Sequence, residues 1–299
     1  MNDNITLVVS SCDKYEDAWY PYFELIKKYW PTHPEKIALI TESKKYRLEG
    51  LNIKTYNYPS HYTWSERLYR TLEQITSKYI IFSLEDFFLL DYVKQERIDE
   101  CVQWMEENPN IAVCRLCASD SAVLTPTDKY KDFYAADKNV PFRLETQAAL
   151  WNRETLMSFI DLSEDPWAFE GLGTERIKNT EKLFLWHYTE DLATNEDKIF
   201  CYRLVDSGYG ISWNFWLWNN RAWFEENGIY GVKYHRLGQL SEKAYWRRRN
   251  HLYTRTSTML DRIIKPFWRK WIQLRKVKAN LLIFGLRKGI ALSVKQAKH

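Results

Sequence analysis

The first half of the chain alternates between short apolar runs and longer segments whose apolar residues recur at helical spacing. Strand-like runs occupy residues 5–10, 36–41, 53–58, 79–84 and 111–116. Helix-like segments occupy residues 17–30, 65–78 and 98–107. Because strands that are apolar throughout must be covered on both faces, this alternation predicts an α/β fold, with helices on both faces of a mostly parallel, Rossmann-like sheet.

The second half has a weaker pattern. Residues 118–146 are polar with little periodicity, which predicts a long excursion over a cleft. Residues 146–151 are strand-like and residues 153–160 helix-like. Residues 165–176 predict a loop that opens a helix reaching about Leu185.

The last part of the chain is aromatic and then basic. Residues 199–224 are strongly aromatic, and after Gly238 the chain becomes basic with a helical pattern. No internal repeat and no clear linker interrupts it. We therefore expect one domain over residues 1–240 and a basic amphipathic helical region over residues 241–299.

Polar residues follow three of the predicted strands. These loops are Ser10-Ser11-Cys12-Asp13, Thr41-Glu42-Ser43 and Glu85-Asp86-Phe87. Ligands of such sheets bind at the carboxyl ends of the strands. None of the loops is a Gly-rich phosphate loop, which argues against a dinucleotide oxidoreductase and a P-loop NTPase. No nucleophile elbow or triad spacing indicates a hydrolase.

Glu85 and Asp86 carry the sharpest chemistry. Burial at a strand end disfavours both charges unless a cation pairs with them. A divalent metal that also binds phosphate oxygens would supply that charge. The alternative is a solvated strand end or an acidic pair that caps a helix.

Composition and cysteine usage narrow the class of protein. Aromatic residues make up 16% of the chain, with 14 Trp and 20 Tyr, which suits sugar faces, a membrane interface or a large aromatic core. The five cysteines have no framework spacing, so we expect reduced thiols. The N-terminus lacks the features of a signal peptide and no window of 18 uncharged apolar residues occurs, which predicts a cytoplasmic protein.

The net charge of +4 hides a basic end. Residues 265–299 hold ten Lys or Arg and no acid, whereas the other 264 residues hold 33 basic and 39 acidic groups. Cations interleaved with aromatic and aliphatic residues over 262–299 predict peripheral binding to an anionic membrane surface. A nucleic-acid arm and a packed oligomerisation helix are the alternatives, and the acidic body argues against nucleic acid.

Four stretches of this chain resemble the GT-A class of nucleotide-sugar transferases, particularly small bacterial ones of capsular or surface polysaccharide synthesis. They are VVSSCDKYEDAW, WSERLYRTLEQITSKYIIFSLEDFFLL, ETQAALWNRETL and PWAFEGLGTER. The resemblance spans roughly residues 5–240 and lies in the order of the motifs. One departure is that Glu85-Asp86-Phe87 stands where the class has Asp-any-Asp, which keeps a metal-independent mechanism open.

The resemblance implies a GT-A-like catalytic domain and a site for a nucleotide-sugar donor, with Mn or Mg as the expected ion. Asp86 would bind the metal or the donor phosphates, and a late His235 would be a second metal ligand. The expected donor-binding residues are Ser10, Ser11, Asp13, Trp64, Arg67, Glu85, Asp86, Gln147 and Arg176.

An inverting transfer needs a carboxylate that takes the proton of the acceptor hydroxyl. Glu170 is the candidate base, with Asp165 and Glu175 as alternatives. Trp167 and Phe169 flank Glu170 and are expected to stack on sugar faces. Arg176 is expected to pair with Glu170 or to contact phosphate.

The sequence thus predicts a glycosyltransferase at the inner face of a membrane, which moves a sugar to a glycan or lipid-linked acceptor in surface polysaccharide synthesis. A non-catalytic glycan-binding or scaffold protein is the alternative from another class. A nucleotidyltransferase fits less well, because Ser10-Ser11-Cys12 is a poor match to its Gly-rich basic loop. The donor sugar, stereochemistry and oligomeric state stay open.

Overall fold

The computed structural model describes residues 4–119, 124–190, 198–202, 208–234 and 238–249. The chain divides into two compact units, residues 1–240 and 241–299. In the second unit residues 242–249 are helical. The predicted membrane-binding segment, residues 262–299, lies outside the described residues. No helix among the described residues is both long and apolar enough to cross a membrane.

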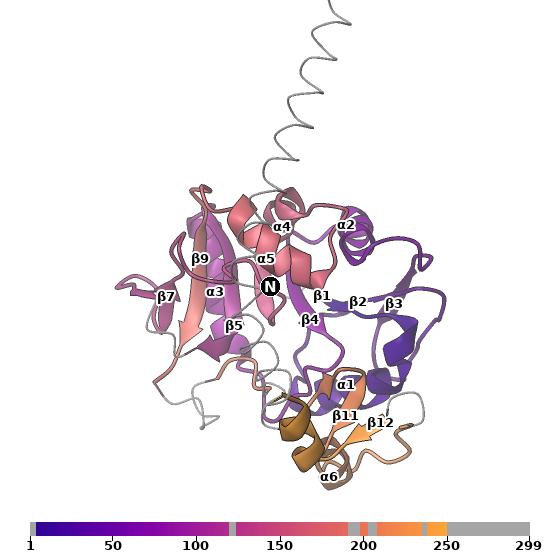
Figure 1. Cartoon of the computed structure of the whole chain (residues 1–299). Helices are drawn as coiled ribbons and strands as arrows, with labels where there is room; N and C mark the ends of the chain where they lie inside the picture. Colours follow the sequence, from indigo (N-terminus) through magenta and orange to yellow (C-terminus); the bar gives the residue numbers. More distant parts are fainter. Residues whose placement is uncertain (1–3, 120–123, 191–197, 203–207, 235–237, 250–299) are drawn as a thin grey trace, which may run out of the picture. The chain divides into compact units, whose positions relative to one another are not determined.

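A nine-stranded sheet organises the first unit, in the order β3-β2-β1-β4-β8-β5-β9-β7-β6 (Figure 1). Its strands are β1 (Ile5–Ser10), β2 (Lys36–Thr41), β3 (Ile53–Asn57), β4 (Tyr79–Leu84), β5 (Ile111–Ser119), β6 (Thr125–Pro126), β7 (Phe133–Ala135), β8 (Ala149–Asn152) and β9 (Leu183–Tyr188). Strands β3, β2, β1 and β4 are parallel, as are β5 and β9. Strand β8 is antiparallel to both β4 and β5, so β8 begins at the edge where β4 ends.

Helices cover both faces of this sheet, which confirms the expected α/β class. Helices α1 (Glu16–Tyr29) and α3 (Gln95–Glu107) bury apolar residues in one core with Leu7, Val9 and Ile81. Helices α2 (Trp64–Gln74), α4 (Arg153–Phe159) and α5 (Pro166–Arg176) belong to a second core with Val8 and Ile80. Because neighbouring strand residues point to opposite faces, strands without polar interruption serve both cores.

The expected loop over residues 165–176, opening a helix that reaches about Leu185, is wrong, because residues 166–176 are themselves the helix and residues 183–188 form a strand. Helix α5 begins at Pro166, with Asp165 as its N-cap, and ends at Arg176. Leu183–Tyr188 then forms β9, which lies between β5 and β7. Four apolar or aromatic residues open this run, and its pairing with two strands decides its conformation.

The aromatic stretch contributes two strands of a small three-stranded sheet and most of one helix. The sheet has the order β10 (Ile211–Ser212), β11 (Phe215–Leu217) and β12 (Gly238–Leu240), and α6 spans Asn220–Glu226. Trp213 and Asn214, with φ of 49° and 66°, form the turn between β10 and β11. This left-handed pair is typical of a two-residue hairpin turn. The hairpin is placed so that the residue before it, Gly210, reaches the end of β4.

Candidate active site

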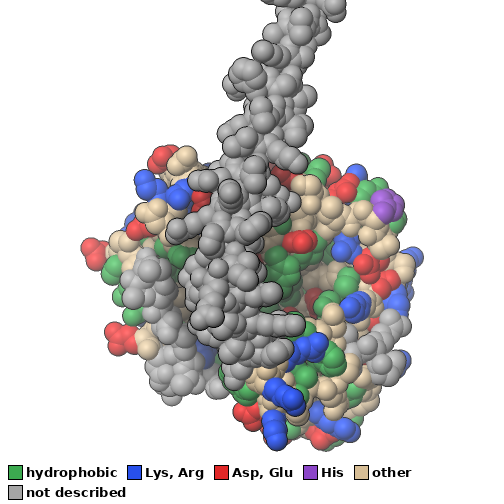
Figure 2. All heavy atoms as spheres, in the orientation of Figure 1, with side chains coloured by type: hydrophobic (Ala, Val, Ile, Leu, Met, Phe, Trp, Pro, Cys, Tyr) green, Lys and Arg blue, Asp and Glu red, His purple; other side chains and the backbone are tan. Residues whose placement is uncertain are grey.

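A cavity of about 640 Å³ opens where β1 and β4 end. Nine of the residues predicted for the site line it: Ser10, Ser11, Trp64, Arg67, Glu85, Asp86, Gln147, Asp165 and Glu170. Figure 2 shows a hollow between the surface formed by α2 and α5 and that formed by β11 and β12, with hydrophobic and acidic side chains on its walls. The topology therefore brings together residues from Ser10 to Ile211, which are far apart in the sequence.

The acidic pair that follows β4 lines this cavity, with Glu85 buried and Asp86 half-buried. Glu85 is 7% exposed. Burial, and then the neighbouring Asp86 carboxylate, raise the pKa of Glu85 well above its usual value. Burial likewise raises the pKa of Asp86 to about 6, against the hydrogen bond that its Oδ2 accepts from the backbone N of Ile211 at 3.0 Å. No Lys or Arg among the described residues forms an ion pair with either carboxylate.

Gly210 explains how the hairpin reaches Asp86. Its φ is +85°, and a Cβ added to it would lie 3.3 Å from Asp86 Oδ2. Glycine suits this position for two reasons: it tolerates the left-handed backbone conformation, and it has no Cβ to crowd the Asp86 carboxylate. The sequence analysis missed Gly210. Its signal, a glycine on either side of Tyr209 in an aromatic stretch, is visible in the sequence.

The two serines after β1 lie under the cavity wall as hydrogen-bond acceptors. Ser10 Oγ accepts the indole N–H of Trp64 at 2.8 Å, and Ser11 Oγ accepts that of Trp19 at 2.7 Å. Both serines are buried. These bonds fix the loop between β1 and α1 against α2.

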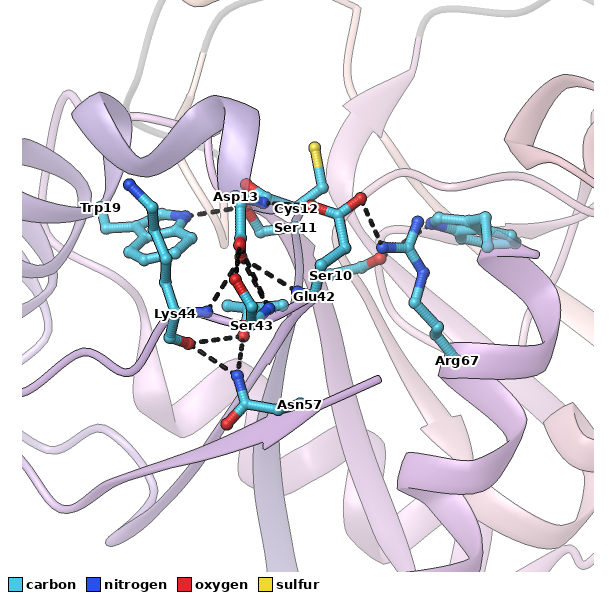
Figure 3. Close-up of polar contacts among 12 residues, drawn as sticks. Ser10, Ser11, Cys12, Asp13, Trp19, Glu42, Ser43, Lys44, Asn57 and Arg67 are labelled. Carbon is cyan, nitrogen blue, oxygen red and sulfur yellow. Dashed lines mark hydrogen bonds and ion pairs between the residues drawn. The ribbon is translucent and has the colours of Figure 1, made fainter. Parts of the chain in front are cut away.

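Arg67 reaches the cavity from α2 but is paired with Glu42. Its Nη1 lies 3.1 Å from Glu42 Oε1, while Glu42 Oε2 accepts the backbone N–H of Asp13 at 2.7 Å. The Nε atom of Arg67 is buried and has no hydrogen-bond partner among the described residues. Figure 3 shows Glu42 between Asp13 and Arg67. The guanidinium is thus held at the cavity wall with part of its hydrogen-bonding capacity unused.

Asp13 does not line the cavity, contrary to expectation. Its Oδ1 accepts the backbone N–H groups of Glu42 at 3.0 Å and Lys44 at 3.2 Å (Figure 3). Partial burial acts to raise the pKa of Asp13, but hydrogen bonds from the Ser43 hydroxyl and from the backbone of this loop lower it overall. Asp13 therefore shapes the loop after β2, which in turn positions Glu42.

Arg176 also lies outside the cavity lining. Its Nη1 pairs with Glu164 Oε1 at 2.6 Å, and its Nη2 donates to the carbonyl oxygen of Phe159 at 2.7 Å. The expected pair with Glu170 does not form, because residues six apart on a helix do not share a face. Arg176 instead ties the end of α5 to the segment before it.

Of the three candidate bases, Glu170 and Asp165 line the cavity, whereas Glu175 does not. Glu170 is half-buried, and its Oε1 accepts the backbone N–H of Thr146 at 2.9 Å and the Thr146 hydroxyl at 2.6 Å. Its Oε2 has no partner among the described residues. Asp165 is exposed and caps α5 by accepting the backbone N–H of Ala168 at 2.8 Å. Glu170 is thus oriented with one free oxygen, whereas an oxygen of Asp165 serves the helix.

The two aromatic neighbours of Glu170 have separate environments. Trp167 lines the cavity and is 80% exposed. Phe169 is 2% exposed, and its ring lies 5.3 Å from the Trp64 ring. Trp167 is thus accessible to a sugar, whereas the expectation for Phe169 is wrong, because it belongs to the core beneath α5.

Eleven further residues line the cavity: Cys12, Tyr15, Leu84, Phe87, Thr146, Pro166, Trp167, Tyr202, Tyr209, Gly210 and Ile211. Only the last four of them lie outside the stretches that carry the resemblance. Tyr15 donates its hydroxyl to Asn214 Oδ1 at 2.9 Å, which joins the start of α1 to the hairpin turn. Burial, with a contribution from Glu85, raises the pKa of Tyr15 to about 12. Tyr15 is therefore a neutral phenol at physiological pH.

The described residues contain no group of three or more His, Cys, Asp or Glu side chains arranged to hold a metal. The expected ligand His235 lies outside the described residues. The carboxylates of Glu85 and Asp86 are hard oxygen donors without a cationic partner in the described part of the chain. Their chemistry fits Mn²⁺ or Mg²⁺ whose remaining ligands come from phosphate and water.

No protein-family model matches the chain, and no curated protein matches it by sequence. Solved structures match the chain by the course of the backbone. CMP:2-keto-3-deoxy-manno-octonic acid synthetase in complex with CTP matches at 14% identity over 65% of this chain and 92% of that chain, with a TM-score of 0.41. TarS 1–349 from S. aureus matches at 12% identity over 63% of this chain and 58% of that chain, with a TM-score of 0.41.

Glucosyl-3-phosphoglycerate synthase from Mycobacterium tuberculosis, in complex with Mn²⁺ and UDP-glucose, matches at 12% identity. The match covers 69% of this chain and 73% of that chain, with a TM-score of 0.40. At such identities and TM-scores these similarities concern the course of the chain only. The activity has to be inferred from the residues of the site.

The raised pKa of Asp86 makes a prediction about stability. An acid whose pKa is higher in the folded than in the unfolded state loses stability as the pH rises between the two values. Here that window runs from the ordinary value of 3.8 to about 6. Asp86→Asn keeps an acceptor for Ile211 without the buried charge. We expect the variant to match the wild type at pH 4 and to exceed its free energy of unfolding at pH 7.5 by about 1 to 3 kcal/mol.

Denaturant unfolding at the two pH values measures this difference. Asp128→Asn, at an exposed position away from the cavity, is the control and should behave as the wild type at both pH values. An Asp86→Asn variant that is less stable than the wild type at pH 7.5 would contradict the prediction.

Proposed function

We propose that this protein is a glycosyltransferase that moves a sugar from a nucleotide-sugar donor to a glycan or lipid-linked acceptor in surface polysaccharide synthesis. The observation that carries the proposal is the meeting of Asp86 and the oriented Glu170 in one cavity at the carboxyl ends of the strands. Such a transfer needs a place for the diphosphate leaving group and a base for the acceptor hydroxyl. The cavity offers a candidate for each.

Asp86 would hold the donor diphosphate through a divalent ion, with Glu85 beside it. The ion supplies the positive charge that the buried carboxylates lack and that the leaving diphosphate requires. Arg67 lines the same cavity, and its planar guanidinium suits phosphate oxygens. Ser10 and Ser11 shape the wall on which the nucleoside would rest.

Glu170 would accept the proton of the acceptor hydroxyl at its free Oε2. The two hydrogen bonds from Thr146 fix the other oxygen and hence the direction of the carboxylate. The exposed Trp167 ring offers a flat apolar face to an acceptor sugar at the cavity lining. This role requires inversion of configuration at the anomeric carbon.

The basic segment 262–299 supports a place at the inner face of a membrane, where lipid-linked acceptors would be within reach. Its cations are interleaved with Phe267, Trp268 and Trp271. Each Lys or Arg near an anionic surface contributes about 1 kcal/mol. The combination suits peripheral binding of the protein to such a surface.

Asp86→Asn tests the donor site. Loss of the carboxylate charge should lower turnover of a nucleotide sugar by about 100-fold or more. Release of nucleoside diphosphate from UDP-glucose, UDP-N-acetylglucosamine or GDP-mannose, with and without Mn²⁺, measures it. A glycan-binding protein without catalysis would release none, even as the wild type. Asp128→Asn is the control. Full activity of Asp86→Asn would show that Asp86 does not take part in donor binding.

Glu170→Gln tests the base. The amide keeps an acceptor for Thr146 but does not take up a proton at neutral pH, so kcat should fall by about 10² to 10⁴ while the affinity for the donor changes little. Glu175→Gln, an exposed position on the same helix, should retain the wild-type rate. An unchanged rate in Glu170→Gln would assign proton transfer elsewhere or indicate a retaining reaction.

Removal of residues 262–299 tests the membrane proposal. The shortened chain should no longer sediment with phosphatidylglycerol vesicles, whereas the full chain should do so in a salt-dependent way. Phosphatidylcholine vesicles are the control. Equal binding of both chains to the anionic vesicles would place the contact outside this segment.

A further inference from the structure

The side-chain amide of Gln147 is held in one orientation from beneath the cavity. Its Oε1 accepts the hydroxyl proton of Tyr202 at 2.6 Å and the thiol of Cys117 at 3.9 Å. The Tyr202 oxygen in turn accepts the backbone N–H of Ala148 at 3.2 Å. Two donors therefore meet at the carbonyl end of the amide.

A buried ion pair supports these donors. Arg115 Nε lies 2.8 Å from Cys117 Sγ and 2.9 Å from Glu145 Oε1. The Tyr202 ring stacks on Phe87, the residue after the acidic pair, with ring centres 4.2 Å apart and planes at 13°. Burial raises the pKa of Tyr202 well above its usual value, so its hydroxyl keeps the proton that it donates. The orientation of Gln147 thus depends on a network that is tied to the acidic loop.

The other end of the amide remains available to a ligand. Gln147 lines the cavity, and its Nε2 has no partner among the described residues. Four carboxylates also line the cavity, those of Glu85, Asp86, Asp165 and Glu170. In a cavity rich in acceptors, the free N–H₂ of Gln147 is a fixed neutral donor for a ligand oxygen.

The sheet order places Gln147 on the opposite side of β4 from the loops that would hold the nucleoside. The loops of β2 and β1, with Glu42 and Ser10, lie on one side of β4. Strand β8 lies on the other side and, being antiparallel, begins where β4 ends. Gln147 precedes β8 and follows Thr146, which holds the candidate base. A donor whose diphosphate lies at Asp86 would therefore extend its sugar toward Gln147.

We propose that Gln147 selects the donor sugar by donating a hydrogen bond from its Nε2 to a hydroxyl or carbonyl oxygen of an uncharged sugar, and that Tyr202 is its positioning residue. The carboxylates that share the cavity exclude a sugar acid by repulsion of like charge. This inference rests on the proposed function, because it assumes a nucleotide-sugar donor with its diphosphate at Asp86.

Gln147→Ala tests the inference by comparing two ligands. Titration calorimetry measures the affinity for UDP, GDP, UDP-glucose, UDP-N-acetylglucosamine, GDP-mannose and, as a sugar acid, UDP-glucuronic acid. The variant should bind the preferred neutral nucleotide sugar about 5- to 10-fold more weakly than the wild type and the matching nucleoside diphosphate equally well. Gln103→Ala, at an exposed position on α3, should change neither affinity.

Two further variants separate hydrogen bonding from folding. Gln147→Glu keeps the size of the side chain but presents an acceptor, and it should lose affinity for the same nucleotide sugar only. Tyr202→Phe keeps the stacked ring and removes the hydroxyl, so it should show the same selective loss to a smaller degree. A merely structural role of Tyr202 would weaken both ligands together.

The outcomes are distinct. Unchanged binding of nucleotide sugars by Gln147→Ala and Gln147→Glu, an equal loss for diphosphate and nucleotide sugar, or a wild-type preference for UDP-glucuronic acid would each overturn the inference. A wild type that binds no nucleoside diphosphate would overturn the proposed function itself, and the inference with it. A selective loss confined to the sugar would support both.

Discussion

Two adjacent carboxylates, one buried and one half-buried, that form no ion pair with the described residues are the constraint on which the site depends. Burial disfavours the charge of Glu85 and Asp86, and their proximity disfavours it further. A side chain that served only the fold would not be expected at this position, because an apolar residue would avoid the cost. The described part of the chain compensates the pair with hydrogen bonds, such as that from the backbone N–H of Ile211 to Asp86 Oδ2, rather than with an ion pair. The unmet demand for positive charge is what a metal–diphosphate ligand would satisfy.

The fold concentrates this demand at one edge by its strand order. Strands β1 and β4 are parallel neighbours in which Ser10 pairs with Leu84. Ser10 and Glu85 therefore lie at the same edge of the sheet. Strand β8 enters in the opposite direction, which brings Thr146 and Gln147 to the same edge from a distant part of the sequence. The hairpin of β10 and β11 then closes over Asp86 at Gly210, where no side chain other than hydrogen fits without strain. Each wall of the cavity therefore comes from a different segment.

The sequence predicted those features that depend on local pattern. Strands β2 and β4 match their expected bounds, because their apolar runs end at polar residues. The acidic pair could be found because it follows such a strand directly. The sequence did not predict that Asp13 and Arg176 lie outside the cavity lining. Asp13 bonds to backbone groups of the loop after β2, and Arg176 pairs with the Glu164 carboxylate, and tertiary structure brings both partners near. Strand β9 was missed because its pairing with β5 and β7 outweighs the preceding helical pattern. Tyr202 and Cys117 have no motif, and only the structure brings them under Gln147.

Arg67 belongs to a charged network with Glu42 and Asp13, so its positive charge is not independent of the other two residues. Its guanidinium carries the positive charge that would suit the acidic pair. This charge is already paired with Glu42, whose Oε1 lies 3.1 Å from Arg67 Nη1. Glu42 is itself fixed by the backbone of Asp13, and Asp13 by the loop after β2. Moving Arg67 toward Asp86 would leave the half-buried Glu42 carboxylate without its cation, so one charge would be satisfied at the expense of another. Within the described residues, such a rearrangement only transfers the lack of positive charge from the acidic pair to Glu42.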